Sequence, residues 1–231
     1  MASNHTNTNA QKASRTYGGL SLEARKAQRK EQFLRAGLEI FGTIGFRNAT
    51  VRSLCKEAKL TDRYFYDSFG NLENLLKAVY ARCMTNLSKE ILKSIKQNYQ
   101  VGDAASAITA GLDAYFRELE NPQIAQICMV ELEGINPEVN KLYYSYINGF
   151  ARMLIALADH AFPSWQLDTK QKEVIGISMI GAMRQSATHW LVSDYQIERA
   201  DLVSASRQLF LSMIKQIKSQ SAAVKNDTPP A

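Results

Sequence analysis

The chain has 231 residues, of which 45% are hydrophobic and 22% charged, and its formal net charge at pH 7 is +6. These shares are ordinary for a folded protein, and they exclude a fully disordered chain, a collagen and a coiled-coil rod. The 12 glycines and 5 prolines are few, and every proline lies at or after Pro122. The composition therefore favours long helices over a turn-rich β sandwich.

The sequence gives no sign of a membrane span, a secretion signal or a disulfide framework. The most apolar run, residues 174–183, is ten residues long, which is about half of what a spanning helix needs. Residues 1–17 are polar and lack the apolar centre of a secretion signal. Three cysteines, Cys55, Cys83 and Cys128, are widely spaced. We therefore expect free thiols in a cytoplasmic protein that holds no metal.

The positive charge is concentrated in the first third of the chain. Residues 1–76 carry 12 Lys and Arg against 7 Asp and Glu, whereas residues 77–231 carry 16 against 15. A small basic module on a nearly neutral body suggests a polyanion as the partner of that module. A solvated basic surface without a partner explains the charge equally well.

Helix-start and helix-stop residues predict an all-α protein of about nine helices, because no stretch alternates in the manner of a strand. The first four helices are expected at residues 21–45, 50–58, 61–69 and 71–97, with Ser21, Thr50, Thr61 and Asn71 as their N-caps. Asp103 opens a fifth helix, and the dipeptides Asn121-Pro122 and Asn136-Pro137 open a short sixth and a long seventh. The last two are expected at residues 168–194 and 198–219.

The expected organisation follows from these helices. Residues 1–20, rich in Ser, Asn, Thr and Gly, are expected to be a disordered arm. A three-helix domain should occupy residues 21–75 and a larger helical domain residues 76–220. Residues 221–231 are expected to be a disordered tail.

The two short helices at residues 50–69 have the length and pattern of a helix-turn-helix. Phe65 and Phe69 are four residues apart and can face the core. The outer side, which would have to fit a major groove about 12 Å wide, is then left to Asp62, Arg63, Tyr64, Tyr66 and Asp67. By spacing alone, a corner of two helices with no DNA partner is an equally good interpretation. The basic residues around it favour the DNA reader.

Several short segments within residues 25–80 occur in a specific order and spacing. They are Ala36–Phe46, Thr50–Leu54, Glu57-Ala58, Leu60-Thr61, Tyr66, Phe69 and Leu75-Leu76. Together they resemble the DNA-binding domain of TetR/AcrR-type transcriptional regulators. The resemblance implies a homodimer that binds a near-palindromic operator. It also implies a helical C-terminal domain that binds a small ligand and dimerises through its last two long helices.

The resemblance also implies roles for single residues. Thr50 would cap the second helix at a phosphate, with Arg52 close to the DNA backbone. Thr61, Asp62, Arg63 and Tyr64 would begin the recognition helix, and Tyr66 would reach a phosphate. Three positions depart from the family pattern: Lys59 stands where a turn glycine is usual, Leu72 where a lysine is common, and Arg63 where a small residue is frequent. A lysine at positive φ costs about 1–2 kcal/mol, whereas an arginine at position 63 favours a guanine in the half-site.

Aromatic and Met residues on three of the predicted C-terminal helices are compatible with an adaptable apolar pocket. Each of them is also compatible with ordinary core, and the resemblance is what favours a pocket. The expected pocket residues are Tyr115, Phe116, Met129, Tyr143, Tyr146, Phe150 and Met153. Glu131, if it faces the pocket, would favour a cationic ligand.

The last two long helices are apolar over more than one stripe, and the eighth has small residues at Ser178, Ala182 and Ser186. This pattern fits helices that need neighbours both within the subunit and across a dimer interface. Two inner helices of a monomer are the alternative. The expected interface residues are Ile180, Met183, Trp190, Leu209, Phe210 and Met213.

The sequence is therefore interpreted as a non-enzymatic, sequence-specific DNA-binding regulator, a repressor that an apolar or amphipathic ligand releases from its operator. Its expected partners are duplex DNA, a second copy of itself and that small molecule, with no cofactor and no membrane. Two alternatives stay open: a DNA-binding regulator that senses no ligand, and a helical enzyme with an incidental helix-turn-helix corner. No nucleophile elbow, phosphate loop or zinc motif supports the enzyme.

Overall fold

The computed structural model describes residues 21–100, 103–163, 165 and 167–226. Within these ranges the chain forms nine α-helices, as the sequence predicts, and one short 3-10 turn, Phe46–Asn48, which it does not predict. The helices are α1 Leu22–Ile44, α2 Val51–Ala58, α3 Asp62–Phe69, α4 Leu72–Asn98, α5 Ala104–Glu118, α6 Pro122–Met129, α7 Pro137–Ala161, α8 Thr169–Val192 and α9 Arg199–Asn226. The expected N-terminal arm lies outside the described residues.

The helix starts follow from side-chain caps. Ser21 accepts a hydrogen bond from the backbone N–H of Ala24, and Asn71, Asn136 and Asp168 cap α4, α7 and α8 in the same way. Thr61 is an exception, because it occupies the N-cap position of α3 but makes no capping hydrogen bond. The carboxylate of Asp62 accepts the N–H of Arg63 at 2.8 Å instead.

The end of α9 differs from the prediction. The helix continues to Asn226 rather than ending near Ser219, so it includes the first residues of the expected tail. No glycine or proline occurs between Ser219 and Pro229, and nothing in the sequence therefore stops the helix earlier. Residues 227–231 lie outside the described part of the chain.

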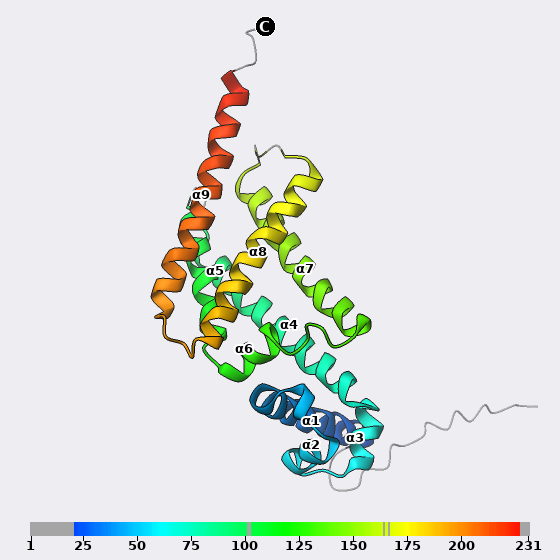
Figure 1. The fold of residues 1–231 in the computed structure, drawn as a ribbon. Coiled ribbons are helices and arrows are strands. Elements are labelled where there is room, and N and C mark those ends of the chain that lie inside the picture. The colour runs from blue at the N-terminus through cyan, green and yellow to red at the C-terminus, as the bar shows by residue number, and fades with distance from the viewer. Residues whose placement is uncertain (1–20, 101–102, 164, 166, 227–231) are drawn as a thin grey trace, which may run out of the picture.

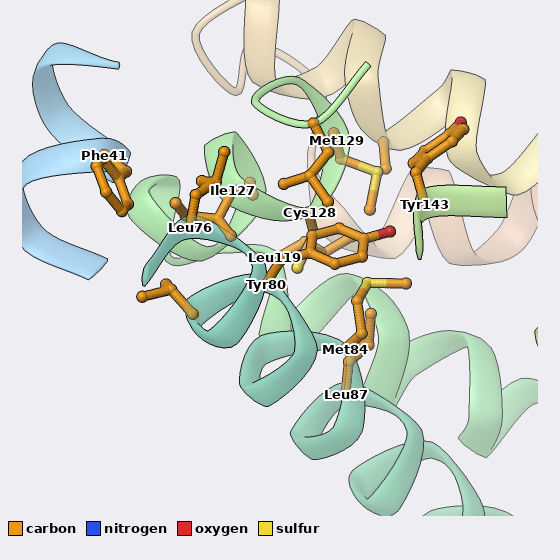
Figure 2. Close-up of a cluster of buried hydrophobic side chains, with 14 of the residues drawn as sticks. Phe41, Leu76, Tyr80, Met84, Leu87, Leu119, Ile127, Cys128, Met129 and Tyr143 are labelled. Atoms are coloured by element: carbon orange, nitrogen blue, oxygen red, sulfur yellow. The ribbon is translucent and has the colours of Figure 1, made fainter. Parts of the chain in front are cut away.

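Helices α1–α3 form one end of the molecule, here called the reading head, and α4 leads from it into the body formed by α5–α9 (Figure 1). The apolar core continues between the two parts. Figure 2 shows it running from Phe41 of α1 through Leu76 and Ile127 to Tyr80 and Met84. The boundary expected at residues 75 and 76 thus falls inside one unbroken helix.

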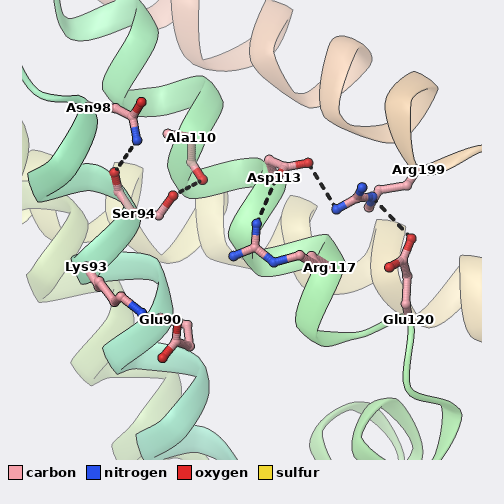
Figure 3. A network of polar contacts seen from close by, with 9 residues as sticks. All are labelled: Glu90, Lys93, Ser94, Asn98, Ala110, Asp113, Arg117, Glu120 and Arg199. Carbon is pink, nitrogen blue, oxygen red and sulfur yellow. Dashed lines mark hydrogen bonds and ion pairs between the residues drawn. The ribbon is translucent and has the colours of Figure 1, made fainter.

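Two kinds of contact fix α4. At the reading head, Gly37 of α1 lies so close to α4 that a Cβ there would be 2.8 Å from Val79 Cγ2. In the body, Ser94 donates a hydrogen bond to the carbonyl of Ala110 on α5 at 2.9 Å (Figure 3). Helix α5 is in turn held to α9 by Arg199, which pairs with Asp113 and Glu120 at 3.1 Å each.

Candidate functional site

The reading head is built around three phenylalanines. Phe33 of α1 meets Phe65 and Phe69 of α3 edge to face, with ring centroids 5.5 and 6.3 Å apart. All three are buried. Because α3 is anchored through this one side, its opposite side is left to solvent.

The turn between α2 and α3 depends on Lys59. This residue has φ 54° and ψ 41°, the left-handed conformation that usually favours glycine. The N–H of the next residue, Leu60, donates to the carbonyl of Cys55 at 3.0 Å and closes the turn. The departure from the usual turn glycine thus leaves the backbone geometry of the motif intact.

The exposed side of α3 contains most of the residues expected to contact DNA. Thr61, Asp62, Arg63 and Asp67 are exposed, and Tyr66 is 56% exposed. Tyr64 differs from them, because it is only partly exposed and the guanidinium of Arg29 lies 4.2 Å from its ring centroid. Its ring faces α1 and is less available for reading bases than the sequence pattern indicates.

The start of α2 is a second surface suited to DNA. Thr50 and Ser53 form a reciprocal capping box with hydrogen bonds of 3.0 and 3.1 Å. Arg52 in the first turn is exposed. A helix N-terminus flanked by an arginine favours a phosphate group. At the start of α4 Leu72 is partly buried and provides no charge, while Asn71 caps the helix.

The body encloses a cavity of about 470 Å³ that is lined by α4 to α9. Four of the expected pocket residues line it, namely Tyr115, Met129, Phe150 and Met153. Apolar side chains make up nearly all of the lining, and its volume is within the range of small-molecule sites, about 300–1,000 Å³.

Three other expected pocket residues do not line the cavity. Phe116 is fully buried and packs edge to face on Trp190. Tyr146 packs on Tyr80, and Tyr143 lies beneath the guanidinium of Arg184. These three side chains project from helices that border the cavity, but from other faces of those helices.

The expected acidic residue is not in the cavity wall, which has cations instead. Glu131 does not line the cavity: its carboxylate accepts hydrogen bonds from the N–H of Phe46 and from Gln126, both at 2.6 Å. Arg184 of α8 lines the cavity instead. It is the one cation within an otherwise apolar stretch of α8, and this was the available signal in the sequence.

The expected interface residues on α8 and α9 are mostly used within the subunit. Met183, Trp190 and Phe210 are buried, and Ile180 and Met213 line the cavity. Leu209 alone of the set is on an outer face, where it is 55% exposed. Other exposed apolar residues on α8 are Val174, Ile177 and Val192, at 63, 40 and 70%. Five of the six expected interface residues are thus used for packing within the chain, and the subunit interface itself stays a prediction.

Among the described residues, no group of three or more His, Cys, Asp and Glu side chains could hold a metal ion. No helix in that part of the chain is long and apolar enough to cross a membrane.

Comparisons with known proteins agree with this geometry. The family model described as "Bacterial regulatory proteins, tetR family" matches residues 33–79. The fatty acid metabolism regulator protein of Bacillus subtilis (strain 168) is 20% identical over 185 residues, which cover 79% of this chain and 94% of that protein.

Solved structures show the same fold. The fatty acid degradation regulator FadR from Bacillus halodurans superimposes with a TM-score of 0.69 at 18% identity, covering 79% of this chain and 94% of that one. FadR from Bacillus subtilis, solved in complex with stearoyl-CoA, gives 0.67 at 18% identity, with 78 and 96% covered. Residues 33–79 therefore match the DNA-binding domain of the tetR family of bacterial regulatory proteins, and the described chain as a whole has the fold of TetR-type regulators.

Proposed function

We propose that this regulator is a homodimeric repressor, and that an amphipathic ligand with a long alkyl chain enters its cavity and releases it from an operator. One observation carries the proposal: the cavity is lined by α4 and α6, which are also the helices of the body that pack on the reading head. A ligand that displaces either helix would therefore move the recognition helix.

The shape of the cavity favours a long chain. Its lining follows α4 from Met84 to Tyr99, a distance of about 22 Å at 1.5 Å per residue. Burying a methylene group contributes about 0.8 kcal/mol, so an alkyl chain would gain affinity along the whole length. That a FadR of the same fold was solved with stearoyl-CoA supports this choice of ligand class.

The contact between α6 and the reading head is close and partly polar. Gln123 of α6 donates to Glu39 of α1 at 2.6 Å. Gly42 of α1 leaves no room for a side chain, because a Cβ there would be 2.6 Å from Gln123 Cβ. Glu131, just after α6, accepts the N–H of Phe46. A shift of α6 would thus be transmitted to α1, on which α3 is packed.

The proposed dimer uses the outer stripe of α8 and α9. Val174, Ile177 and Leu209 are exposed there, and no atom of the described residues lies within 4 Å of a Cβ built on Gly181. Small and apolar residues on one face allow helices of two subunits to approach closely. Two reading heads held in this way would meet half-sites about one helical turn or more apart.

DNA selection followed by titration tests the function. Duplexes selected by the purified protein from a random pool would identify an operator, whose affinity is then measured by fluorescence anisotropy with and without hexadecanoate. We expect affinity for the operator to fall about 5–150-fold when the ligand is present. If an alkyl ligand binds in the cavity but operator affinity does not change, ligand control is contradicted. That result would favour a DNA-binding regulator that does not respond to a small molecule. Failure to select any DNA would contradict the role of the reading head.

A further inference from the structure

The cavity has polar groups at its two ends, and they differ in kind. The distal end, at the C-termini of α4 and α7, has Lys96, Tyr99 and His160, with the Tyr99 and His160 ring centroids 5.9 Å apart. The proximal end, next to α6, has Arg184 and the hydroxyl of Tyr115. The wall between the two ends is apolar, so a ligand with a single polar group can place that group at the proximal or at the distal end but not between them.

Arg184 at the proximal end is only partly neutralised. Its Nη2 donates to the carbonyl of Met129 at 2.6 Å and to the carboxylate of Glu133 at 2.9 Å. Its Nε is buried and has no hydrogen-bond partner among the described residues. The side chain is 17% exposed, whereas that of Glu133 is 57% exposed. A carboxylate in water screens a buried cation weakly, which leaves Arg184 with capacity for a second anion.

Two hydroxyl groups near Arg184 also lack good partners. The hydroxyl of Tyr80 is buried and makes no hydrogen bond within the part of the chain that the structure describes. That of Tyr115 makes only long contacts, 3.4 Å to the carbonyl of Met183 and 3.8 Å to the sulfur of Met129. Tyr80 does not itself line the cavity, but in Figure 2 its ring lies between Cys128 and Met84, which do. Burial raises the pKa of both phenols, so each remains a neutral donor.

Buried donors without acceptors are uncommon in folded proteins and call for an explanation. We propose that the proximal end binds the carboxylate of a long-chain carboxylic acid, with Arg184 as its counter-ion, Tyr115 as a further donor from the cavity wall, and Tyr80 as a donor from directly behind that wall. The alkyl chain then extends along α4 toward Tyr99. This inference rests on the proposed function, and it narrows the ligand from any alkyl amphiphile to a free acid.

The charge of the cavity wall separates a free acid from a coenzyme A thioester. A coenzyme A head group has several phosphates, which require a group of cations at one mouth. Among the described residues the lining has one arginine at the proximal end and one lysine at the distal end. A single carboxylate on Arg184 matches this distribution.

The position of Arg184 also connects the head group to the reading head. Met129, whose carbonyl Arg184 holds, is the last residue of α6. A ligand carboxylate would compete with that carbonyl and with Glu133 for the same guanidinium. Binding of the carboxylate would therefore change the contacts at the C-terminal end of α6. Glu131, which lies close to that end, accepts a hydrogen bond from the N–H of Phe46.

Binding of three probes to the full-length protein tests the inference: hexadecanoate, 1-hexadecanol and hexadecanoyl-CoA. We expect the wild-type protein to bind the acid at least about 10-fold more tightly than the alcohol, as a charged hydrogen bond to a buried group implies. Arg184→Met should remove this preference and leave the affinity for the alcohol unchanged. Lys96→Met, the matched control at the distal end, should keep it. Arg184→Lys retains the charge and should keep part of the preference for the acid over the alcohol. This variant keeps the inference testable if Arg184→Met does not fold.

The outcomes separate this inference from the function on which it rests. Equal binding of acid and alcohol, with both releasing DNA, would overturn the carboxylate site and leave the proposed function standing. Two other results would place the head group at the distal end and overturn the carboxylate site at Arg184. One is that Lys96→Met loses the preference for acid over alcohol. The other is that the CoA ester binds most tightly of the three probes and that its affinity does not depend on Arg184. If no probe binds the wild-type protein, the inference and the proposed alkyl ligand are both wrong.

Discussion

The carboxylate of Glu131, which follows α6, accepts the backbone N–H of Phe46, which follows α1, at 2.6 Å. The two residues are 85 positions apart in the chain, and the bond joins the end of α6, whose Met129 lines the cavity, to the reading head. The other oxygen of Glu131 is held by Gln126. The carboxylate is thus fixed on both sides, and it is well placed to transmit a movement of α6.

Glu131→Gln tests this relationship. The amide keeps the shape of the side chain but removes the charge, and hydrogen bonds to charged groups contribute about 1.5–3 kcal/mol against about 1 for neutral ones. We expect ligand affinity to remain near the wild-type value, while the factor by which ligand weakens operator binding decreases. The measurement is operator titration with and without hexadecanoate. Glu138→Gln, at an exposed position on α7, is the control; an undiminished factor in Glu131→Gln would exclude this route of coupling.

The exposed side of α3 gives a second prediction. Arg63→Ala should weaken binding to a selected operator by about 1–3 kcal/mol and relax the preference at one base pair. Tyr66→Phe should weaken binding to all sequences alike, since a phosphate contact carries no base information. Tyr64→Phe is the control, because Arg29 covers its ring, and it should have little effect. If both test variants bind with wild-type affinity across a salt titration, α3 is not the recognition helix.

The third prediction concerns the subunit interface. Ile177→Glu and Leu209→Glu each place a charge on the exposed stripe of α8 and α9 and should give monomers in light scattering. Operator affinity should fall in the same two variants, because a monomer can bind only one of the two half-sites. Leu22→Glu, at a similarly exposed apolar residue on α1, should leave the mass unchanged. Dimers in both α8 and α9 variants would show that the subunits associate elsewhere.

The fourth prediction separates a ligand-binding hydroxyl from a structural one. Tyr80→Phe removes a buried hydroxyl without a partner, so the free energy of unfolding should rise by about 1 kcal/mol or stay level, while hexadecanoate binds more weakly. Tyr195→Phe removes a hydroxyl that donates to Leu119 at 3.0 Å and should lower stability by about 1 kcal/mol. Thermal melts and ligand titrations measure both. A loss of stability in Tyr80→Phe with unchanged ligand affinity would argue against the role given to Tyr80.

The parts of this fold that could be read from the sequence are those that local chemistry decides. Caps such as Asn71 and Asn136 act on N–H groups three residues away, and the left-handed Lys59 follows from the turn alone. The cavity lining, and which apolar residues of α8 and α9 stay exposed, depend on neighbours from distant helices. Phe210 and Leu209 are adjacent and equally apolar, yet one is buried and the other exposed. No sequence period distinguishes them, because α9 is apolar on more than one side.

The most direct test of ligand control is the affinity of hexadecanoate for the free dimer and for the dimer saturated with operator, measured by calorimetry at one salt concentration. Linkage requires that operator weakens the ligand by the same factor by which the ligand weakens operator. We expect a factor of about 5–150, equal in the two directions. Identical affinity of the ligand for the free and the operator-bound dimer would contradict the account, because a ligand that does not distinguish two states cannot shift one into the other.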